Sequence, residues 1–526
     1  MTIDSRNDIA LGKLMQRRDA LKLLGTGIAA ASLGEISLGG TAGAQQPKRG
    51  GILKVAAPNN PTSLDPYTGG GGLDHTHLYN IFDNLIEFDY ETLKPIPGLA
   101  ESWAFPDPKT MVLNLRAGVL FHDGTPCDAE AVKWNIENGR TDPRSNVKAD
   151  FTTVAATEVT GPLQVTLRLN QPDSALPLIL ADRAGMMSSP KAVQALGKEH
   201  NRKPVGTGPY TIVSWVDGDR IILKRNEKYW RDGRPYLDGI EIQVITEIGT
   251  AVRSVLAGDN HYVYFMSPQQ KPLVDRAKNL TVVSAPTVYC LLIYFNFSRP
   301  PFNDVRIRKA INYAVNREDF VKLTLGGVAE TANMLLPKAH WAYDAKTAEM
   351  YPHSIEKAKQ LLAEAGHKDG IELTLVSYTD QTYLRRQDVL IEQLSKAGIK
   401  LRFINGTITT GMFFAEQKGD GLLAAWTGRP DPSLSYSLMF LKDAYYNPGR
   451  VEVSKELTEA INNSRISDSI EERRKHFATA QRLMMEHALC VPLAFQPELD
   501  AFHTRVKGYK PNLLGKPKFE HIWLEG

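Results

Sequence analysis

Cysteine is scarce in this chain of 526 residues, which has three: Cys127, Cys290 and Cys490. An odd and sparse count argues against a framework of disulfides. Cys290 and Cys490 each lie in an apolar run that is typical of a buried strand. Free buried thiols are therefore the favoured interpretation, and a bridge between these two is the alternative.

Long hydrophobic runs and an excess of one charge are also missing. No segment has the roughly 18 uninterrupted apolar residues that indicate a membrane-spanning helix. The formal net charge is +3, too close to balance to indicate binding to nucleic acid or to a membrane surface. We therefore expect no nucleic-acid partner.

Motifs for catalysis are absent from the sequence as well. There is no Gly-x-Ser-x-Gly elbow, no His-Glu-x-x-His and no Walker loop. His75 and His77 form a His-x-His, but no cysteine or cluster of carboxylates lies nearby to complete a metal site. We predict a protein that is not an enzyme and has no cofactor and no metal.

The first 44 residues are typical of a targeting segment rather than of a folded domain. Arg17 and Arg18 precede a weakly apolar run rich in Gly and Ala, and Ala42-Gly43-Ala44 offers a small-x-small cleavage site. This pattern predicts a twin-arginine signal peptide over 1–44, cleaved near Ala44, and a soluble periplasmic chain. An amphipathic N-terminal helix with a chance arginine pair is the alternative.

Helical and strand patterns alternate along the rest of the chain, which predicts mixed α/β lobes. Asp128 is placed to cap a helix that ends at Gly139, and Ser354 is placed to cap another. The other predicted helices are 75–85, 304–315, 355–365 and 382–397. The predicted strands are 51–56, 111–115, 119–122, 163–169, 289–295, 371–376, 399–404 and 490–495.

A series of motifs follows in a fixed order. The most informative is the stretch 113–134, which contains Phe121-His-Asp-Gly-Thr-Pro126. The others include Ser63-Leu-Asp-Pro66, Leu99-Ala-Glu-Ser-Trp103, Gly206-Thr-Gly-Pro-Tyr210, Arg225-Asn-Glu-Lys-Tyr-Trp230, Ala363-Glu-Ala-Gly366, and Trp426 with Asp431-Pro432. Together they resemble the extracytoplasmic solute-binding proteins of ABC transporters, family 5, of the dipeptide, oligopeptide and nickel-binding type.

The resemblance implies a two-lobed periplasmic-binding-protein fold of type II, with an extra inserted domain, a cleft between the lobes and a two-strand hinge. Mapped onto this sequence, lobe one takes 48–86, 202–288 and 491–526. A satellite domain is inserted at 87–201, and lobe two takes 289–490. The runs around Cys290 and Cys490 are the expected crossings between the lobes.

A peptide-like zwitterion enclosed between two lobes needs a partner for each of its charges. By resemblance to the peptide binders, Asp431 is the candidate for the solute's α-amino group, and capping the turn before Pro432 is its alternative role. Arg385 or Arg386 is the candidate for a carboxylate, which suits a guanidinium. Aromatic side chains should line the pocket, and we expect Trp426, Tyr67, Tyr79 and Trp341 to do so.

The resulting hypothesis is a periplasmic solute-binding subunit of an ABC importer. It captures dipeptides, oligopeptides or similar zwitterions by hinge closure and delivers them to membrane permease subunits as a monomer. The same fold could instead bind an opine, an oligosaccharide, a nickel chelate or an aromatic compound. A periplasmic hydrolase is the remote alternative, and it lacks a recognisable nucleophile and base.

Overall fold

The structure of this protein is a computed structural model that describes residues 46–526, with gaps at 70–73, 407–408, 443 and 468. Pro47–Gly526 forms a compact unit. The predicted targeting segment, 1–44, lies outside the described residues.

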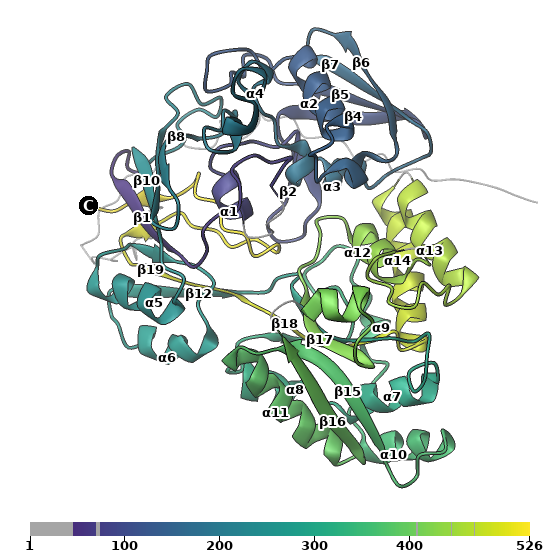
Figure 1. Ribbon diagram of the computed structural model, residues 1–526. Coiled ribbons are helices and arrows are strands. Elements are labelled where there is room, and N and C mark those ends of the chain that lie inside the picture. Colours follow the sequence, from purple (N-terminus) through teal and green to yellow (C-terminus); the bar gives the residue numbers. More distant parts are fainter. Residues whose placement is uncertain (1–45, 70–73, 407–408, 443, 468) are drawn as a thin grey trace, which may run out of the picture. The chain divides into compact units, whose positions relative to one another are not determined.

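A mixed seven-stranded sheet lies at the centre of the first lobe (Figure 1). Its central strand β1 (Ile52–Ala57) runs parallel to both of its neighbours, β10 and β11. Helix α5 (Ile248–Ala257) packs against this sheet through an apolar face. In spatial order the other strands are β12 (Leu280–Ala285), β19 (Glu498–His503), β11 (Tyr262–Val263), and, beyond β1, β10 (Gly239–Val244), β9 (Arg220–Arg225) and β8 (Tyr210–Val216).

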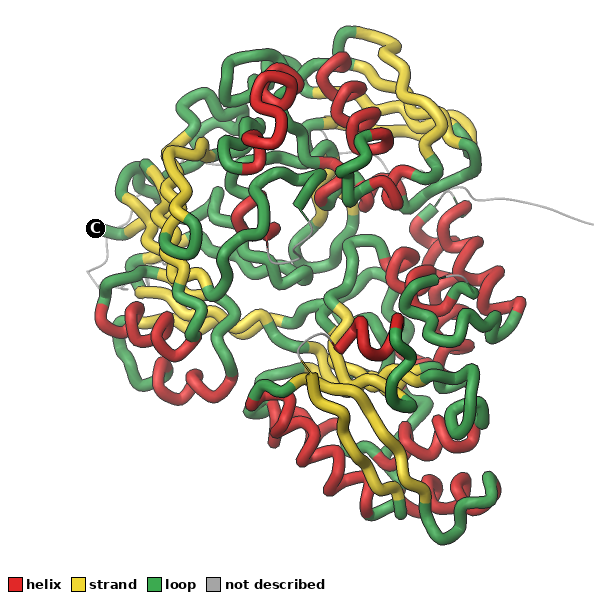
Figure 2. The backbone as a smooth tube through the Cα atoms, viewed as in Figure 1, coloured by secondary structure: helices red, strands yellow, loops and turns green. Residues whose placement is uncertain are grey.

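A six-stranded sheet lies at the centre of the second lobe, with helices packed around it (Figures 1 and 2). Every residue of its inner strands β13 (Cys290–Phe295) and β18 (Cys490–Phe495) is buried. The order continues outward through β17 (Gly421–Trp426), β15 (Ile371–Tyr378) and β16 (Ile399–Gly406), with β14 (Glu330–Thr331) on the other edge. The packed helices are α7 (Val305–Ala314), α8 (Arg317–Thr324), α10 (Ile355–Glu364), α11 (Gln381–Ser395), α12 (Pro432–Phe440), α13 (Lys455–Ile466) and α14 (Ile470–Glu486).

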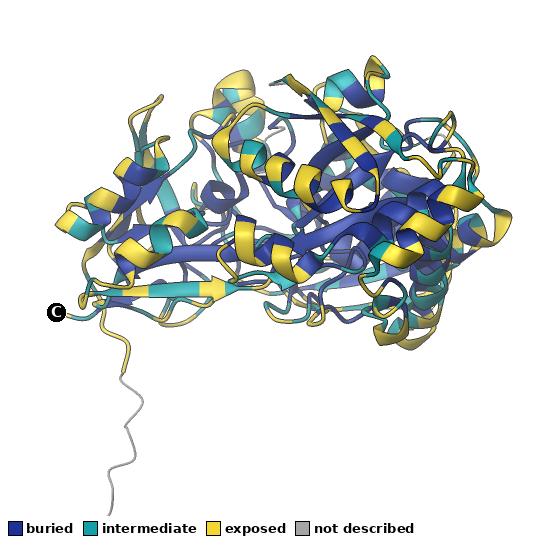
Figure 3. Ribbon diagram, turned by 90° about the horizontal axis from the view of Figure 1, so that it is seen from below, coloured by how far each residue is buried: buried dark blue, intermediate teal, exposed yellow. Residues whose placement is uncertain are grey.

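The two lobes have separate hydrophobic cores. One buried cluster runs from Cys290 to Phe495. The other joins residues between Leu53 and Val288 to residues between Phe502 and Leu524. In both lobes the outer helices bury one face and expose the other (Figure 3). The two-lobed α/β fold class expected from the sequence is therefore confirmed.

The chain passes between the two sheets at 286–289, after β12, and at 496–497, before β19. We call these the first and second crossing. They are tied together, because the Thr287 hydroxyl donates to the Gln496 carbonyl at 2.6 Å and the Gln496 N–H donates to the Tyr289 carbonyl at 2.7 Å. Because β18 pairs with β13, the second crossing comes after the predicted boundary at 491.

The cysteines are free and buried. In the pairing of β13 with β18, Cys490 lies opposite Tyr294, whereas Cys290 lies opposite Phe495. The register thus places the two thiols at different ends of β13, and the interpretation as free thiols is confirmed.

The predicted satellite segment, 87–201, contains a four-stranded antiparallel sheet. Helix α2 (Ala129–Thr141) packs against it, and the Asp128 side chain accepts a hydrogen bond from Ala131 N–H as its N-cap. Its hydrophobic residues join the core of the first lobe. The strands, in order, are β4 (Ala100–Asp107), β5 (Thr110–Leu115), β7 (Gln164–Leu169) and β6 (Val154–Gly161).

Three predicted elements differ from the structure. The helix expected over 75–85 is the short α1 (His75–Leu78), because the next carbonyls bond elsewhere: Gly208 N–H donates to Ile81 and Tyr210 N–H to Asn80. The strand expected over 119–122 is reduced to an isolated bridge between Leu120 and Pro126. The helix expected to end at Gly139 continues to Thr141.

The remaining short elements complete the fold. They are β2 (Ile86–Phe88), β3 (Pro95–Pro97), α3 (Leu176–Ile179), α4 (Pro190–Leu196), α6 (Lys271–Val274), α9 (Ala345–Ala348), β20 (Val506–Lys507) and β21 (Trp523–Leu524).

Candidate functional site

Asp431 is the N-cap of α12 and lies at the end of the loop that follows β17. Its Oδ1 accepts hydrogen bonds from Ser433 N–H at 2.9 Å and from the Ser433 hydroxyl at 2.5 Å. Both carboxylate oxygens also accept from Nη2 of Arg473, at 2.9 and 2.7 Å. The Asp431 side chain is fully buried, where an unpaired charge would be very costly. It caps α12 and carries an internal ion pair, and its contact with a solute amine stays a prediction.

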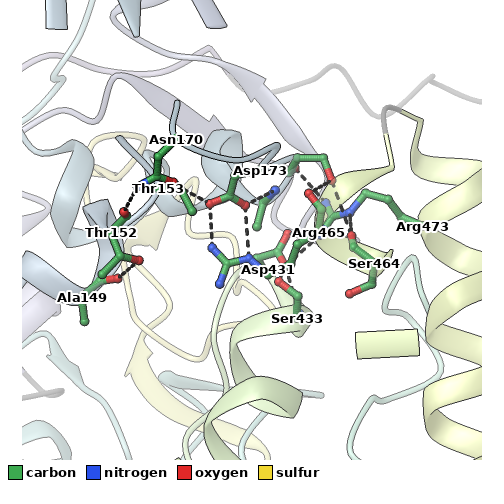
Figure 4. Close-up of polar contacts among 12 residues, drawn as sticks. Ala149, Thr152, Thr153, Asn170, Asp173, Asp431, Ser433, Ser464, Arg465 and Arg473 are labelled. Carbon is green, nitrogen blue, oxygen red and sulfur yellow. Dashed lines mark hydrogen bonds and ion pairs between the residues drawn. The ribbon is translucent and has the colours of Figure 1, made fainter. Parts of the chain in front are cut away.

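Arg473, on α14, connects several parts of this region (Figure 4). Its Nε donates to the Ser464 carbonyl at 2.6 Å and its Nη1 to the Ser174 carbonyl at 3.1 Å. The guanidinium lies 5.3 Å from the centre of the Trp341 ring, a cation–π contact. Arg473 thereby brings together two predicted site residues, Asp431 and Trp341.

Sequence reasoning missed Arg473, although the sequence holds a signal for it. In α14, Arg473 shares the buried face with Phe477, Ala480 and Met484, at helical spacing. An arginine on an apolar stripe indicates a buried ion pair, because a lone charge would not be stable there. Nothing local in the sequence identifies Asp431 as the partner.

A contact between the two lobes lies beside this ion pair (Figure 4). Asp173, which follows β7, accepts from Arg465 Nη2 at 2.6 Å and from Arg465 Nε at 3.2 Å. Asp173 also accepts from the Thr153 hydroxyl at 2.7 Å. The next residue, Ser174, donates its N–H to the Arg465 carbonyl at 2.5 Å. The end of α13 is thus bonded to the first lobe, a feature that the sequence did not reveal.

The two predicted tryptophans are buried. Trp426 donates from Nε1 to the Ser435 hydroxyl at 2.8 Å and meets Tyr446 edge to face. Trp341 Nε1 has no hydrogen-bond partner among the described residues. Beside it, burial lowers the pKa of His340 to about 3, so this ring is neutral near pH 7.

Arg386 and Arg385 are placed very differently on α11. Arg386 is 3% exposed and lies over the Tyr383 ring, 4.6 Å from its centre. Its Nη2 donates to Oε1 of Gln496 in the second crossing, at 3.3 Å, while its Nε has no partner among the described residues. Arg385 is exposed and donates to the Leu323 carbonyl at 2.7 Å. Burial lowers the pKa of Arg386, because the surrounding residues only partly replace the water that would stabilise its positive charge.

Tyr67 and Tyr79 lie in the first lobe and are buried. The Tyr67 hydroxyl donates to the Met186 carbonyl at 3.1 Å. The Tyr79 hydroxyl has no partner among the described residues, and its ring lies 4.4 Å from Nζ of Lys518. Neither tyrosine contacts Asp431 or Arg386 through a hydrogen bond, so the structure spreads the predicted residues over both lobes.

Within the described part of the chain, no group of three or more His, Cys, Asp and Glu side chains is arranged to hold a metal ion. His75 bonds to Asp182 Oδ1 from Nε2 at 2.7 Å. Among the residues that the structure describes, no helix has the length and apolarity to cross a membrane.

Comparison with known proteins places this arrangement in a family. The glutathione-binding protein GsiB of Salmonella paratyphi A is 30% identical over 475 residues, covering 86% of this chain and 91% of that one. The periplasmic binding protein DppA of Helicobacter pylori, solved with the peptide STSA, has a TM-score of 0.77 and 22% identity and covers 91% and 99% of the two chains. CtaP of Listeria monocytogenes, an ABC-transporter substrate-binding protein, has a TM-score of 0.82 and 20% identity over 91% and 100%.

The two crossings, the separate lobe cores and the motif order all agree with the sequence resemblance. The family model for the bacterial extracellular solute-binding proteins, family 5, matches residues 94–448. This chain belongs to the bacterial extracellular solute-binding proteins, family 5.

Proposed function

We propose that this chain is the solute-binding subunit of an ABC importer and that it takes up a peptide-like solute carrying a carboxylate. The family match over 94–448 carries the proposal, and the 30% identity to a glutathione-binding protein supports a peptide-like solute. The solute binds between the lobes, and their closure over it presents the loaded protein to the permease subunits.

Arg386 is the residue proposed to receive the carboxylate. It is buried next to the second crossing, and its Nε is left without a partner among the described residues. A buried guanidinium with open donors is well matched to a carboxylate, which accepts two parallel hydrogen bonds. Asp431 stays the candidate for the solute's α-amino group, which would share the carboxylate with Arg473 and Ser433.

Calorimetric and thermal-shift titrations of the wild-type chain test this function. The probes are glutathione, the peptide Ser-Thr-Ser-Ala, the dipeptide Met-Leu and agropinic acid. A solute at 100 times its Kd should stabilise the chain by about 2.7 kcal/mol. Binding of a peptide probe with a decreased radius of gyration in X-ray scattering supports the proposal. Agropinic acid binding alone would move the solute class to opines, and no binding by any probe would contradict the proposal.

A matched pair of variants tests Arg386. Arg386→Lys keeps the charge but removes the planar fork, and we expect it to weaken binding of the peptide probe roughly tenfold or more. Arg385→Lys makes the same change one residue earlier, on the exposed side of α11, and should leave the affinity unchanged. Equal affinities for the two variants would remove Arg386 from the site.

We also propose that the chain is exported and loses residues 1–44. Arg17 and Arg18 before a weakly apolar run support this step. Mass spectrometry of the protein from the periplasmic fraction should find an N-terminus near residue 45. The double variant Arg17→Lys, Arg18→Lys should keep the precursor in the cytoplasm, and export of that variant would contradict a twin-arginine route.

A further inference from the structure

Two loops approach adjacent residues of the first crossing. Gly428, in the loop between β17 and α12, has φ +70° and packs so closely on Val288 that a Cβ would overlap its side chain. Gly515, in the C-terminal segment, has φ +63°, and a Cβ there would come 2.8 Å from Cγ2 of Thr287. The absence of a side chain allows both approaches. The two loops therefore meet at one point of the hinge.

Each of these glycines is followed by a cation, Arg429 in one loop and Lys516 in the other. The loop of Lys516 is held in place, because Asn512 Nδ2 donates to the Lys516 carbonyl at 2.7 Å and Val288 N–H donates to the Leu513 carbonyl at 2.8 Å. The loop of Arg429 leads into Asp431, which caps α12 and forms an ion pair with Arg473. Both cations are thus carried by fixed backbones. We call Lys516 and Arg429 the hinge cations.

The hinge cations have no direct partner in the chain, although the buried carboxylate of Asp182 attracts both of them. Neither side chain forms a hydrogen bond or ion pair with any residue that the structure describes. Arg429 is exposed and Lys516 is half-buried. Burial lowers the pKa of Lys516 to about 8, and repulsion by Arg429 and Arg183 acts in the same direction, against the attraction of Asp182.

The two acidic side chains near the hinge cations, Asp182 and Asp150, form no ion pair with them. Asp182 Oδ1 accepts from His75 at 2.7 Å and forms no ion pair with either hinge cation. Asp150 is half-buried, and Arg429 is the charged neighbour that lowers its pKa most, but the two side chains form no ion pair. Like charges held together without a direct counter-ion leave a place for an anion from outside the chain.

We propose that Lys516 and Arg429 bind an acidic group of the solute. The solute then carries a carboxylate at the hinge in addition to the one assigned to Arg386, as a peptide-like molecule with two acidic groups does. The ammonium of Lys516 and the guanidinium of Arg429 belong to opposite lobes. Both can bind one carboxylate only when the two loops face it, so this contact favours closure of the lobes. This inference rests on the proposed function and specifies its solute class.

The test combines protein variants with amidated solutes. The probes are glutathione, which has two carboxylates, and its two monoamides, one blocked at the glycine end and one at the glutamyl end. For wild-type protein we expect each monoamide to bind roughly tenfold to hundredfold more weakly than glutathione. Lys516→Met and Arg429→Gln should weaken glutathione binding by a similar factor. Lys510→Met, an exposed lysine in the same C-terminal segment, is the control and should change nothing.

Coupling between variant and probe decides the assignment. One monoamide lacks the group that the hinge cations hold, and for that probe Lys516→Met should cause no further loss. Arg386→Lys should show the same insensitivity to the other monoamide. If the losses from Lys516→Met are the same for all three probes, or absent, the hinge cations do not bind the solute, while the proposed function stands as long as wild-type protein binds glutathione.

A measurement without solute keeps the inference testable if glutathione does not bind; the proposed function fails only if none of its probes binds. Each variant removes the repulsion between the hinge cations together with an attraction to Asp182, so we expect the unfolding temperatures of Lys516→Met and Arg429→Gln to stay close to that of the wild-type chain. A lower unfolding temperature for both variants would show that the cations stabilise the fold, and would overturn the inference.

Discussion

At the scale of single residues, Arg473 and Asp431 form a charge pair without access to water. Arg473 is 4% exposed and Asp431 is fully buried. The pair is satisfied through further bonds to Ser433, Ser464 and Ser174. A buried ion pair adds little stability compared with a well-packed apolar pair of the same size. Removal of one member, however, leaves the other charge buried and uncompensated.

We therefore predict that Arg473→Met lowers the free energy of unfolding by about 3–5 kcal/mol. Asp431→Asn should act similarly, and the double variant should recover part of the loss because no isolated charge is left. Urea unfolding followed by circular dichroism measures all three. A loss below about 1 kcal/mol in Arg473→Met would show that water reaches the pair and that Asp431 is accessible to a solute.

A second residue, His122, is fixed as a neutral ring by two backbone bonds. Its Nε2 donates to the Gly208 carbonyl at 3.0 Å, and its Nδ1 accepts from Gly206 N–H at 3.3 Å. Burial lowers its pKa to about 4, against an ordinary value of 6.5. Protonation therefore favours the unfolded chain, so the stabilisation is complete above pH 6.5 and is lost as the pH falls towards 4.

For this group we predict a loss of about 2 kcal/mol in unfolding free energy between pH 7 and pH 5. His122→Gln cannot titrate and should show a shallower pH dependence by that amount. His353→Gln, at an exposed position, is the control and should keep the wild-type slope. Identical slopes for all three proteins would mean that His122 titrates alike in folded and unfolded chains.

At the scale of elements, helix α2 begins where the sequence predicts, and it ends at Thr141, two residues after the predicted end at Gly139. Its start depends on a local bond, from Ala131 N–H to the Asp128 carboxylate at 3.0 Å, which a sequence pattern encodes directly. Gly139 lies inside the helix, where the Phe151 ring would come 2.8 Å from a Cβ at this position, and the backbone leaves the helical conformation only at Asp142. That glycine serves a contact with a distant residue instead of terminating the helix.

We predict that Asp128→Ala destabilises the protein by about 1 kcal/mol through the lost cap, and that Asp128→Asn costs a few tenths. Thermal unfolding of the two variants, compared with that of Glu130→Ala in the first turn of the same helix, measures this. An equal effect of Ala and Asn would show that the carboxylate charge, and not the capping bond, is what matters.

The same distinction explains how much the sequence could predict. Buried strands such as β13 and β18 and capped helices such as α10 follow from local patterns, and the family motifs supply the two-lobed fold. Asp431 and Trp341 could be singled out in this way, but the link between them could not. It runs through Arg473, and the bond from Arg465 to Asp173 spans 292 residues of sequence. Pairings at such separation are set by the fold, and no local pattern encodes them.

At the scale of the whole molecule, the lobes are connected by two kinds of contact with different demands. The crossings at 286–289 and 496–497 are covalent and are hydrogen-bonded to one another. The contact of Asp173 and Ser174 with Arg465 is not covalent, and it must break if the lobes are to separate. The Asp173 side chain is 0% exposed and that of Arg465 is 21% exposed, so this bond is partly shielded from water.

We predict that Arg465→Gln weakens binding of a peptide solute roughly fivefold to tenfold, because a closed form with fewer bonds is less populated and the apparent Kd rises in proportion. The loss should appear as faster dissociation in stopped-flow fluorescence, since association starts from open lobes that lack the contact. Arg482→Gln, which removes two exposed ion pairs within the second lobe, should leave both rates unchanged. A slower association rate with unchanged dissociation would instead mean that Arg465 acts on the encounter with the solute, and the bond to Asp173 would then have no part in closure.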